Sequence, residues 1–207
     1  MSNMLGGITL AETRGAISDL MEKLSGEHDV EWLTALKKFL RRENPWEKRE
    51  WRAWKTIKLG TFKNVDEIRK ALKAGRHSIS DWAKNILGKP AFKVSETEQD
   101  VELVNISVEE LGFKEGARYA DICKRALEFG LNQCPAEVGP QLRLQFKDQP
   151  KGTYVVVAME AIADSNGDLS VFYLKRYDDG ECCLLANYGH ADYVWDAHYR
   201  FVFLRRK

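Results

Sequence analysis

One stretch of the chain joins a rigid turn to an alternating segment, and it reads Cys134-Pro135-Ala136-Glu137-Val138-Gly139-Pro140-Gln141-Leu142-Arg143-Leu144-Gln145-Phe146. Its last six residues alternate between polar and apolar, which is typical of a strand with one buried face. We therefore expect a strand over residues 141–147. Amides and a guanidinium on the polar face offer hydrogen-bond donors in fixed directions, so this face is a candidate recognition surface.

Two amphipathic helices are expected at the start of the chain. Residues 10–24 and 29–43 each repeat apolar side chains every three or four positions. Asn44-Pro45 ends the second helix, because the residue before a proline is pushed out of the helical region. The short connection between the two helices predicts an antiparallel helical hairpin.

Strand patterns dominate the second half of the chain around one expected helix at 116–129. The further expected strands cover 101–108, 153–162, 169–176, 181–187 and 199–205. Glycine-containing turns at 164–168 and 178–180 favour hairpins. We therefore expect the strands at 153–162, 169–176 and 181–187 to form an antiparallel meander. We predict an α+β fold with a helical hairpin (1–45), a mixed, basic, tryptophan-rich region with short helices (46–90), and an antiparallel sheet with one packed helix (91–207).

The net charge of +1 hides a strongly basic middle segment. Residues 37–76 hold fourteen basic and five acidic residues, whereas the segments on either side are each net −4. Such a local excess indicates an anionic partner, either nucleic acid or an acidic protein. The candidate nucleic-acid contacts are Lys37, Lys38, Arg41, Arg42, Arg49, Arg52, Lys55, Trp51 and Trp54, since cations neutralise phosphates and aromatic rings stack on bases.

The same basic residues also have a purely structural interpretation. Cations near a helix C-terminus complement the helix dipole, and tryptophans usually fill cores. The expected helices at 65–74 and 80–87 are joined by a short connection and are a candidate helix-turn-helix. The first hypothesis is therefore a non-enzymatic binding protein that contacts nucleic acid.

A second hypothesis places a ligand-binding or catalytic site on the polar face of the 141–147 strand. Glu137 is its candidate acid–base group, and Arg143 would hold an anionic group bidentately. Gln141 and Gln145 complete this polar row. The aromatic tail, residues 188–203, would either wall such a pocket or cover the core of the sheet.

The sequence contains no recognisable motif for a metal, a cofactor or catalysis, so we predict no cofactor. The sequence leaves open whether the protein is an enzyme. The loop from Asp164 has Leu169 and Lys175 where a calcium loop needs glycine and glutamate. The adjacent Cys182 and Cys183 would point to opposite sides of a strand, which disfavours a shared zinc ion. The four cysteines lack the spacing of a disulfide framework, and the sequence has no secretion signal, so we expect a cytoplasmic protein. Because no long apolar run occurs, we also expect that the chain does not cross a membrane.

Two stretches resemble a group of small bacterial proteins to which no function is assigned. They are Trp54-Lys55-Thr56-Ile57-Lys58-Leu59-Gly60-Thr61 and the segment from Cys134 to Gln145. The resemblance extends over most of the chain. It implies a bacterial, cytoplasmic origin, and it carries no activity and no functional residue to this sequence.

Overall fold

The computed structural model describes residues 10–42 and 51–206, and the chain divides into two compact units, Met1–Arg49 and Glu50–Lys207. This division differs from the three expected regions. The segment expected as a separate middle region, residues 46–90, lies almost wholly in the larger unit and supplies two strands and two helices to it. Each unit is described by itself below.

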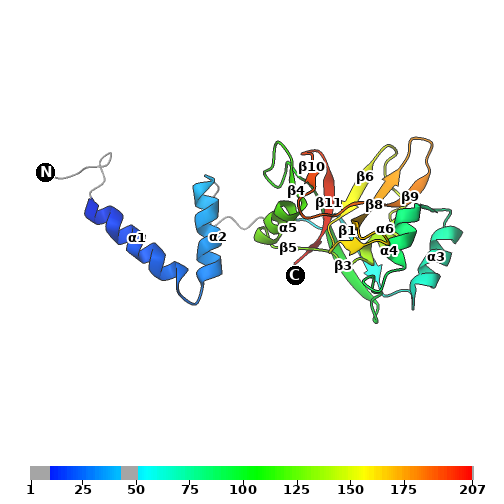
Figure 1. Ribbon diagram of the computed structural model, residues 1–207, viewed down its shortest axis with the longest axis horizontal. Helices are drawn as coiled ribbons and strands as arrows, with labels where there is room; N and C mark the ends of the chain where they lie inside the picture. The colour runs from blue at the N-terminus through cyan, green and yellow to red at the C-terminus, as the bar shows by residue number, and fades with distance from the viewer. Residues whose placement is uncertain (1–9, 43–50, 207) are drawn as a thin grey trace. The chain divides into compact units, whose positions relative to one another are not determined.

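The smaller unit is a helical hairpin. Helix α1 (Leu10–Leu24) and helix α2 (Asp29–Leu40) are joined by a short turn and diverge from it in Figure 1; they contact each other, and Ala35 of α2 is buried. Several large apolar side chains of the hairpin stay exposed, among them Val30 at 72% and Phe39 at 66%. None of the described helices is long and apolar enough to span a membrane.

The larger unit is built on one mixed sheet. Its main path runs β1-β3-β11-β6-β8-β9-β2, with β5 also paired to β11 and β7 to β8. The strands are β1 (Lys55–Leu59), β2 (Ser78–Ile79), β3 (Gln99–Ser107), β5 (Leu131–Asn132), β6 (Tyr154–Val157), β7 (Ile162–Ala163), β8 (Leu169–Arg176), β9 (Cys182–Tyr188) and β11 (Arg200–Arg205). A second small pairing joins β4 (Ala117–Arg118) to β10 (Val194–Trp195).

Strand directions confirm the α+β prediction and refine it. The meander β6-β8-β9 is antiparallel, as the two hairpin turns predict. The pairs β11–β6 and β2–β9 are parallel, so the sheet is mixed rather than purely antiparallel. The long strand expected at 153–162 is two short strands, β6 and β7, which both pair with β8.

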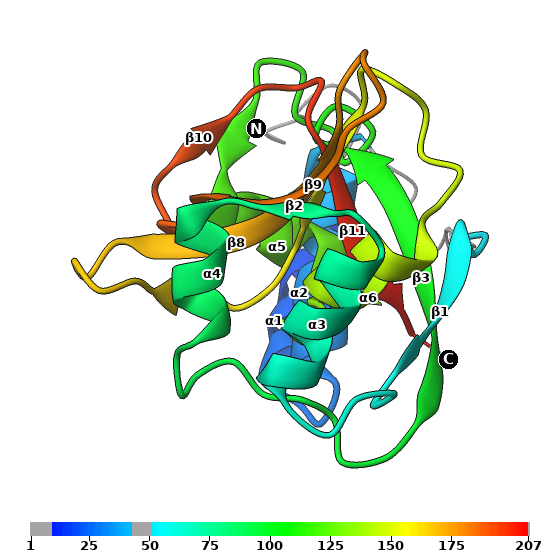
Figure 2. The ribbon, with the colours of Figure 1, turned by 90° about the vertical axis from the view of Figure 1, so that its right-hand side faces the viewer.

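Four helices flank the sheet of the larger unit. Helices α3 (Val65–Ala74), α4 (Asp81–Leu87) and α6 (Val138–Gln145) lie together on one side, and α5 (Tyr119–Glu128) lies on the other (Figures 1 and 2). An asparagine cap begins α3: the Asn64 side chain accepts the Glu67 amide at 3.0 Å, and the Glu67 side chain accepts the Lys63 amide at 2.8 Å.

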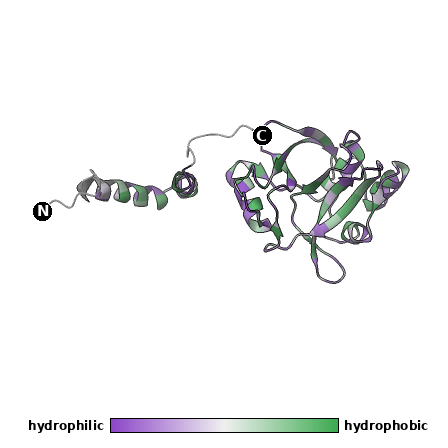
Figure 3. Cartoon of the chain, turned by 90° about the horizontal axis from the view of Figure 1, so that it is seen from above, coloured by the Kyte–Doolittle hydropathy of each residue, from purple (hydrophilic) through white to green (hydrophobic). Residues whose placement is uncertain are grey.

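The core of the larger unit lies between the sheet and these helices. Apolar residues follow the inner side of the strands, while polar residues follow the outer turns (Figure 3). Buried residues from β3, β8 and β11 meet α5 and α6 in one continuous cluster that includes Phe172, Phe201 and Phe203. Trp195 of the aromatic tail is buried against Phe201 at 5.2 Å between ring centroids, so this part of the tail covers the core.

Candidate nucleic-acid interface

The tryptophans of the basic segment pack against the fold. The Trp51 ring lies 6.1 Å from the Phe129 ring, and its indole nitrogen donates to the Phe129 carbonyl at 3.0 Å. The Trp54 ring meets Phe146 edge to face at 4.9 Å. Both tryptophans are half-buried. These contacts give the two rings a structural role, as the alternative interpretation of the sequence holds.

Lys55 likewise contacts other residues of the larger unit. Its ammonium group lies 2.8 Å from Asp148 and 4.5 Å from the centre of the Phe146 ring. Arg52 is exposed. Arg49 lies outside the described residues.

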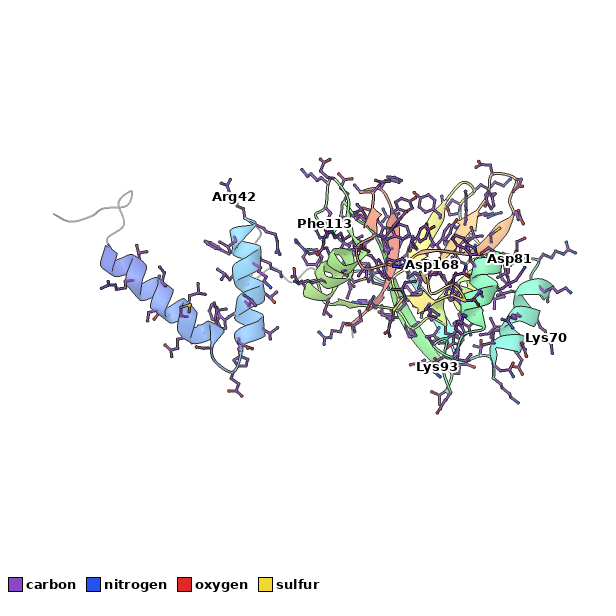
Figure 4. The ribbon with its side chains drawn as sticks, in the orientation of Figure 1. Arg42, Lys70, Asp81, Lys93, Phe113 and Asp168 are labelled. Carbon is purple, nitrogen blue, oxygen red and sulfur yellow. The ribbon has the colours of Figure 1, made fainter. Side chains whose placement is uncertain are left out.

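The other four predicted contacts end the hairpin helix α2. Lys37 and Lys38 occupy its last turn, and the Arg41 amide donates to their carbonyls. Arg42 follows with a left-handed φ of 61° and an exposed side chain, labelled in Figure 4. Cations at this position complement the negative end of the helix dipole. They belong to the smaller unit, so the predicted set is divided between the two units.

A different group of cations surrounds a surface hollow of the larger unit. The hollow measures about 800 Å³ and is lined by Arg69, Lys73, Arg76, His77, Ser78, Ile79 and Lys84. We call it the basic hollow. Arg69 and Lys84 each face a carboxylate on their own helix, Asp66 at 3.4 Å and Asp81 at 2.8 Å. Among the described residues, Lys73 and Arg76 form no ion pair. The basic hollow therefore has a surplus of positive charge.

The end of α3 is shaped around this hollow. The helix closes with Arg76 in the left-handed region (φ 57°), although glycine is the usual residue for that position. The glycine stands one residue earlier, at Gly75, where an added Cβ would lie 2.8 Å from the His77 ring. Gly75 thus makes room for His77, and Arg76 takes the less favourable backbone conformation beside the basic hollow.

The connection between α3 and α4 also differs from the expected helix-turn-helix. It contains strand β2, which pairs in parallel with β9, so a sheet edge separates the two helices. Ser80 caps α4, with its hydroxyl accepting the Ala83 amide at 3.2 Å. Trp82 in the first turn of α4 is 52% exposed and lies 6.1 Å from the Tyr188 ring.

The strand predicted at 141–147 is wrong, because this segment is helix α6. Residues 138–143 of the helix are all buried, so an amphipathic period is absent from the sequence. Pro140 lies in the first turn, where its missing N–H has no intrahelical acceptor to lose. Gly139 lets the helix approach the sheet, since an added Cβ would lie 2.7 Å from the Phe172 ring.

On this helix the polar row splits into two parts. Glu137, Gln141 and Gln145 are four residues apart and share one face. Gln145 accepts the Lys58 amide and donates to the Lys58 carbonyl, both at 2.9 Å. Glu137 accepts the amides of Gly60 and Ser95, both at 2.8 Å. Gln141 donates to the Thr61 hydroxyl at 2.8 Å and to Glu137 at 3.0 Å.

Gln145 bonds the outer edge of β1 at Lys58, while Glu137 and Gln141 bond the segment that follows the strand, at Gly60 and Thr61. The three side chains therefore bond groups of the protein itself, which is a structural use of residues that the second hypothesis assigns to a ligand. Arg143 lies elsewhere on α6, fully buried, where it donates to the Phe146 carbonyl at 2.8 Å and to Gln149 at 2.5 Å. Burial lowers the pKa of its guanidinium.

Other reactive groups of the described chain are not gathered into a site. No group of three or more histidine, cysteine or carboxylate side chains that could hold a metal ion occurs within residues 10–42 and 51–206. The four cysteines are free thiols, and burial raises the pKa of Cys123 to about 11. A search of family models, curated proteins and solved structures finds no match to the chain.

Arg69, Lys73 and Arg76 of the basic hollow belong to the basic segment 37–76, but none of them is among the contacts predicted from the sequence. The signal for the basic hollow was present, because Arg69, Lys73 and Arg76 follow each other at intervals of four and three residues. That spacing places cations on one face of a helix.

Proposed function

We propose that the protein is a non-enzymatic binding protein that contacts nucleic acid through the basic hollow. The observation that carries this proposal is the grouping of Arg69, Lys73, Arg76 and Lys84 around one hollow, with Lys73 and Arg76 lacking an acidic partner among the described residues. Unpaired lysine and arginine side chains neutralise phosphates and release counterions, which is the main source of affinity in sequence-independent binding.

The positions of the cations around the basic hollow bear on which part of a nucleic acid this interface would contact. Lys73 lies on α3 and Lys84 on α4, so the cations approach a backbone from two helices on either side of β2. Lys70, also on α3, is exposed and points away from the body of the larger unit (Figure 4). This arrangement suits phosphate contacts, which position a nucleic acid without reading its bases.

The test is a salt-dependent titration against single-stranded DNA, double-stranded DNA and RNA. A Lys73→Gln/Arg76→Gln variant is compared with wild type. If both side chains contact phosphates of duplex DNA, the slope of log K against log salt falls by about 2 in the variant. For about four phosphate contacts, wild-type affinity falls on the order of 100-fold between about 50 and about 200 mM salt.

Two control variants test whether binding depends on the cations of the basic hollow or on the total positive charge of the protein. Lys114→Gln/Lys124→Gln removes the same charge from exposed positions outside the basic hollow and should leave the slope unchanged. Lys37→Gln/Lys38→Gln removes two hairpin cations and tests the contacts first expected from the sequence. Absence of binding at low salt would overturn the proposal, since the electrostatic contribution is greatest there.

A further inference from the structure

Two arginines meet at one neutral residue behind the basic hollow. Arg143 donates from Nη1 to the Gln149 side-chain oxygen at 2.5 Å, and Arg176 donates from Nη1 to the Gln149 carbonyl at 2.7 Å. Gln149 is fully buried, and its amide nitrogen donates to the Thr153 carbonyl at 2.9 Å. A neutral amide thus stands where a carboxylate would normally balance buried guanidinium groups.

Neither arginine has an acidic partner among the described residues. Removing an unpaired charge from water costs several kcal/mol per ion. The pKa of Arg143 is lowered chiefly by burial, and the positive charge of Arg176 lowers it further. The nearby thiol of Cys183 has a pKa raised by burial to about 11, so it is neutral near pH 7 and supplies no counter-charge.

Both of these arginines, and His77 of the basic hollow, have a side-chain nitrogen that is not used for hydrogen bonding among the described residues. Arg143 Nε, Arg176 Nε and His77 Nδ1 are buried side-chain atoms that have no hydrogen-bond partner within the described parts of the chain. Burial and the charge of Arg143 both lower the pKa of His77, and a hydrogen bond with the Cys182 backbone raises it. Buried polar atoms are almost always satisfied, so the free nitrogens of the two arginines that share Gln149 are candidates for binding an anion.

His77 connects this group to solvent. It lines the basic hollow, while Arg143 acts on it from the interior side. Lys73 and Arg76, which lack acidic partners, line the same hollow. An anion entering the basic hollow would therefore pass from exposed cations to buried ones.

We propose that Arg143, Arg176 and His77 form a binding site for a tetrahedral oxyanion, with a phosphate group as its natural ligand. The two free arginine nitrogens supply N–H donors to the anion, and His77 adds a donor from Nδ1 when the bound anion holds the imidazole protonated. The anion in turn supplies the charge that Gln149 lacks. The phosphate is either free inorganic phosphate or the terminal phosphate of a larger molecule. This site stands on the buried group alone and does not require that the protein bind nucleic acid.

Thermal unfolding with inorganic phosphate, against sodium chloride at equal ionic strength, tests the site. A specific ligand at about 100 times its Kd raises the melting temperature of a domain of this size by about 5–10 °C. Arg176→Gln and His77→Gln should each weaken phosphate binding at least about tenfold, as measured by calorimetry, because the first removes a positive charge and the second a group that can become positive beside the anion.

The control is Arg200→Gln, which changes a half-buried arginine that already has a carboxylate. Arg200 lies 3.0 Å from Glu110 and bonds to the Asn105 side chain at 3.1 Å. This variant loses stability and keeps the full response to phosphate. A wild-type response no larger than that to chloride, or an undiminished response in both Arg176→Gln and His77→Gln, would overturn the site.

A pair of oligonucleotides distinguishes the two sources of phosphate. A 5′-phosphorylated strand that binds about tenfold more tightly than the same strand without its terminal phosphate assigns the site to a terminal group. Equal binding of both strands, together with stabilisation by inorganic phosphate, assigns it to the free anion. Binding of the unphosphorylated strand reports on the proposed nucleic-acid interface, so either proposal can fail without the other.

Discussion

Substitution of Glu137 by glutamine should destabilise the larger unit strongly, although the two side chains have the same shape. The carboxylate is fully buried and accepts three hydrogen bonds, from the amides of Gly60 and Ser95 and from the Gln141 side chain. Glutamine offers a single acceptor oxygen and turns an NH₂ group toward a backbone N–H. One buried amide is then left facing another donor.

The size of the effect follows from these contacts. Loss of one charge-assisted hydrogen bond, with one buried amide left unsatisfied, costs about 3 kcal/mol in the free energy of unfolding. Urea unfolding followed by tryptophan fluorescence measures it as a lower midpoint at unchanged slope. Amide hydrogen exchange should show selective loss of protection at Gly60 and Ser95.

The matched control is Glu98→Gln, which removes an exposed carboxylate, just before β3, that lies 2.7 Å from the ammonium group of Lys58 on β1. Exposed ion pairs contribute little, so its unfolding midpoint should stay close to that of wild type. A loss below about 1 kcal/mol for Glu137→Gln would refute the view that this carboxylate holds the edge of β1.

Three further changes probe the fold around the site. Arg76→Gly should raise unfolding stability by about 1 kcal/mol, because it relieves a left-handed backbone, while weakening nucleic-acid binding in the titration above. Gly139→Ala should lower stability by about 1–3 kcal/mol in urea unfolding, since its Cβ would overlap the Phe172 ring. The folded-state pKa of His77 is lowered, so the unfolded chain binds more protons between that value and about 6.5. Stability contributed by neutral His77 is therefore present above about pH 6.5 and lost as pH falls through this window, and melting curves of His77→Gln should lack that loss.

The local signals of the sequence were sufficient for most elements of the fold. Helix α3 has the expected bounds, 65–74, and the glycine turns place the β6-β8-β9 meander correctly. The two-residue strands were not predictable, since Ser78 and Ile79 form β2 only because β9 lies beside them. Segments that short have no period of their own.

Helix α6 shows why the central stretch was misassigned. An alternation of six residues fits a strand, and it fits a helix that is buried on nearly every side equally well. The tertiary environment decided the outcome: Gly139 approaches Phe172, and the row from Glu137 to Gln145 finds the open edge of β1. Similarly, the lack of an acidic partner for Arg143 depends on which residues surround α6, so the sequence carried no sign of it.

The way in which α6 closes β1 bears on how the protein behaves at high concentration. An unpaired outer strand is a template for pairing with another chain, and it is a common origin of aggregation. Here side chains occupy the hydrogen-bonding positions of the edge, and the Gln145 side chain bonds both the backbone N–H and the carbonyl of Lys58. Since side chains rather than a further strand cover this edge, one substitution at Gln145 can uncover the Lys58 backbone while leaving the buried Glu137 hydrogen bonds in place. We expect a Gln145→Ala variant to polymerise through β1 while it is still mostly folded, so solubility rather than melting temperature would be the first property to fail.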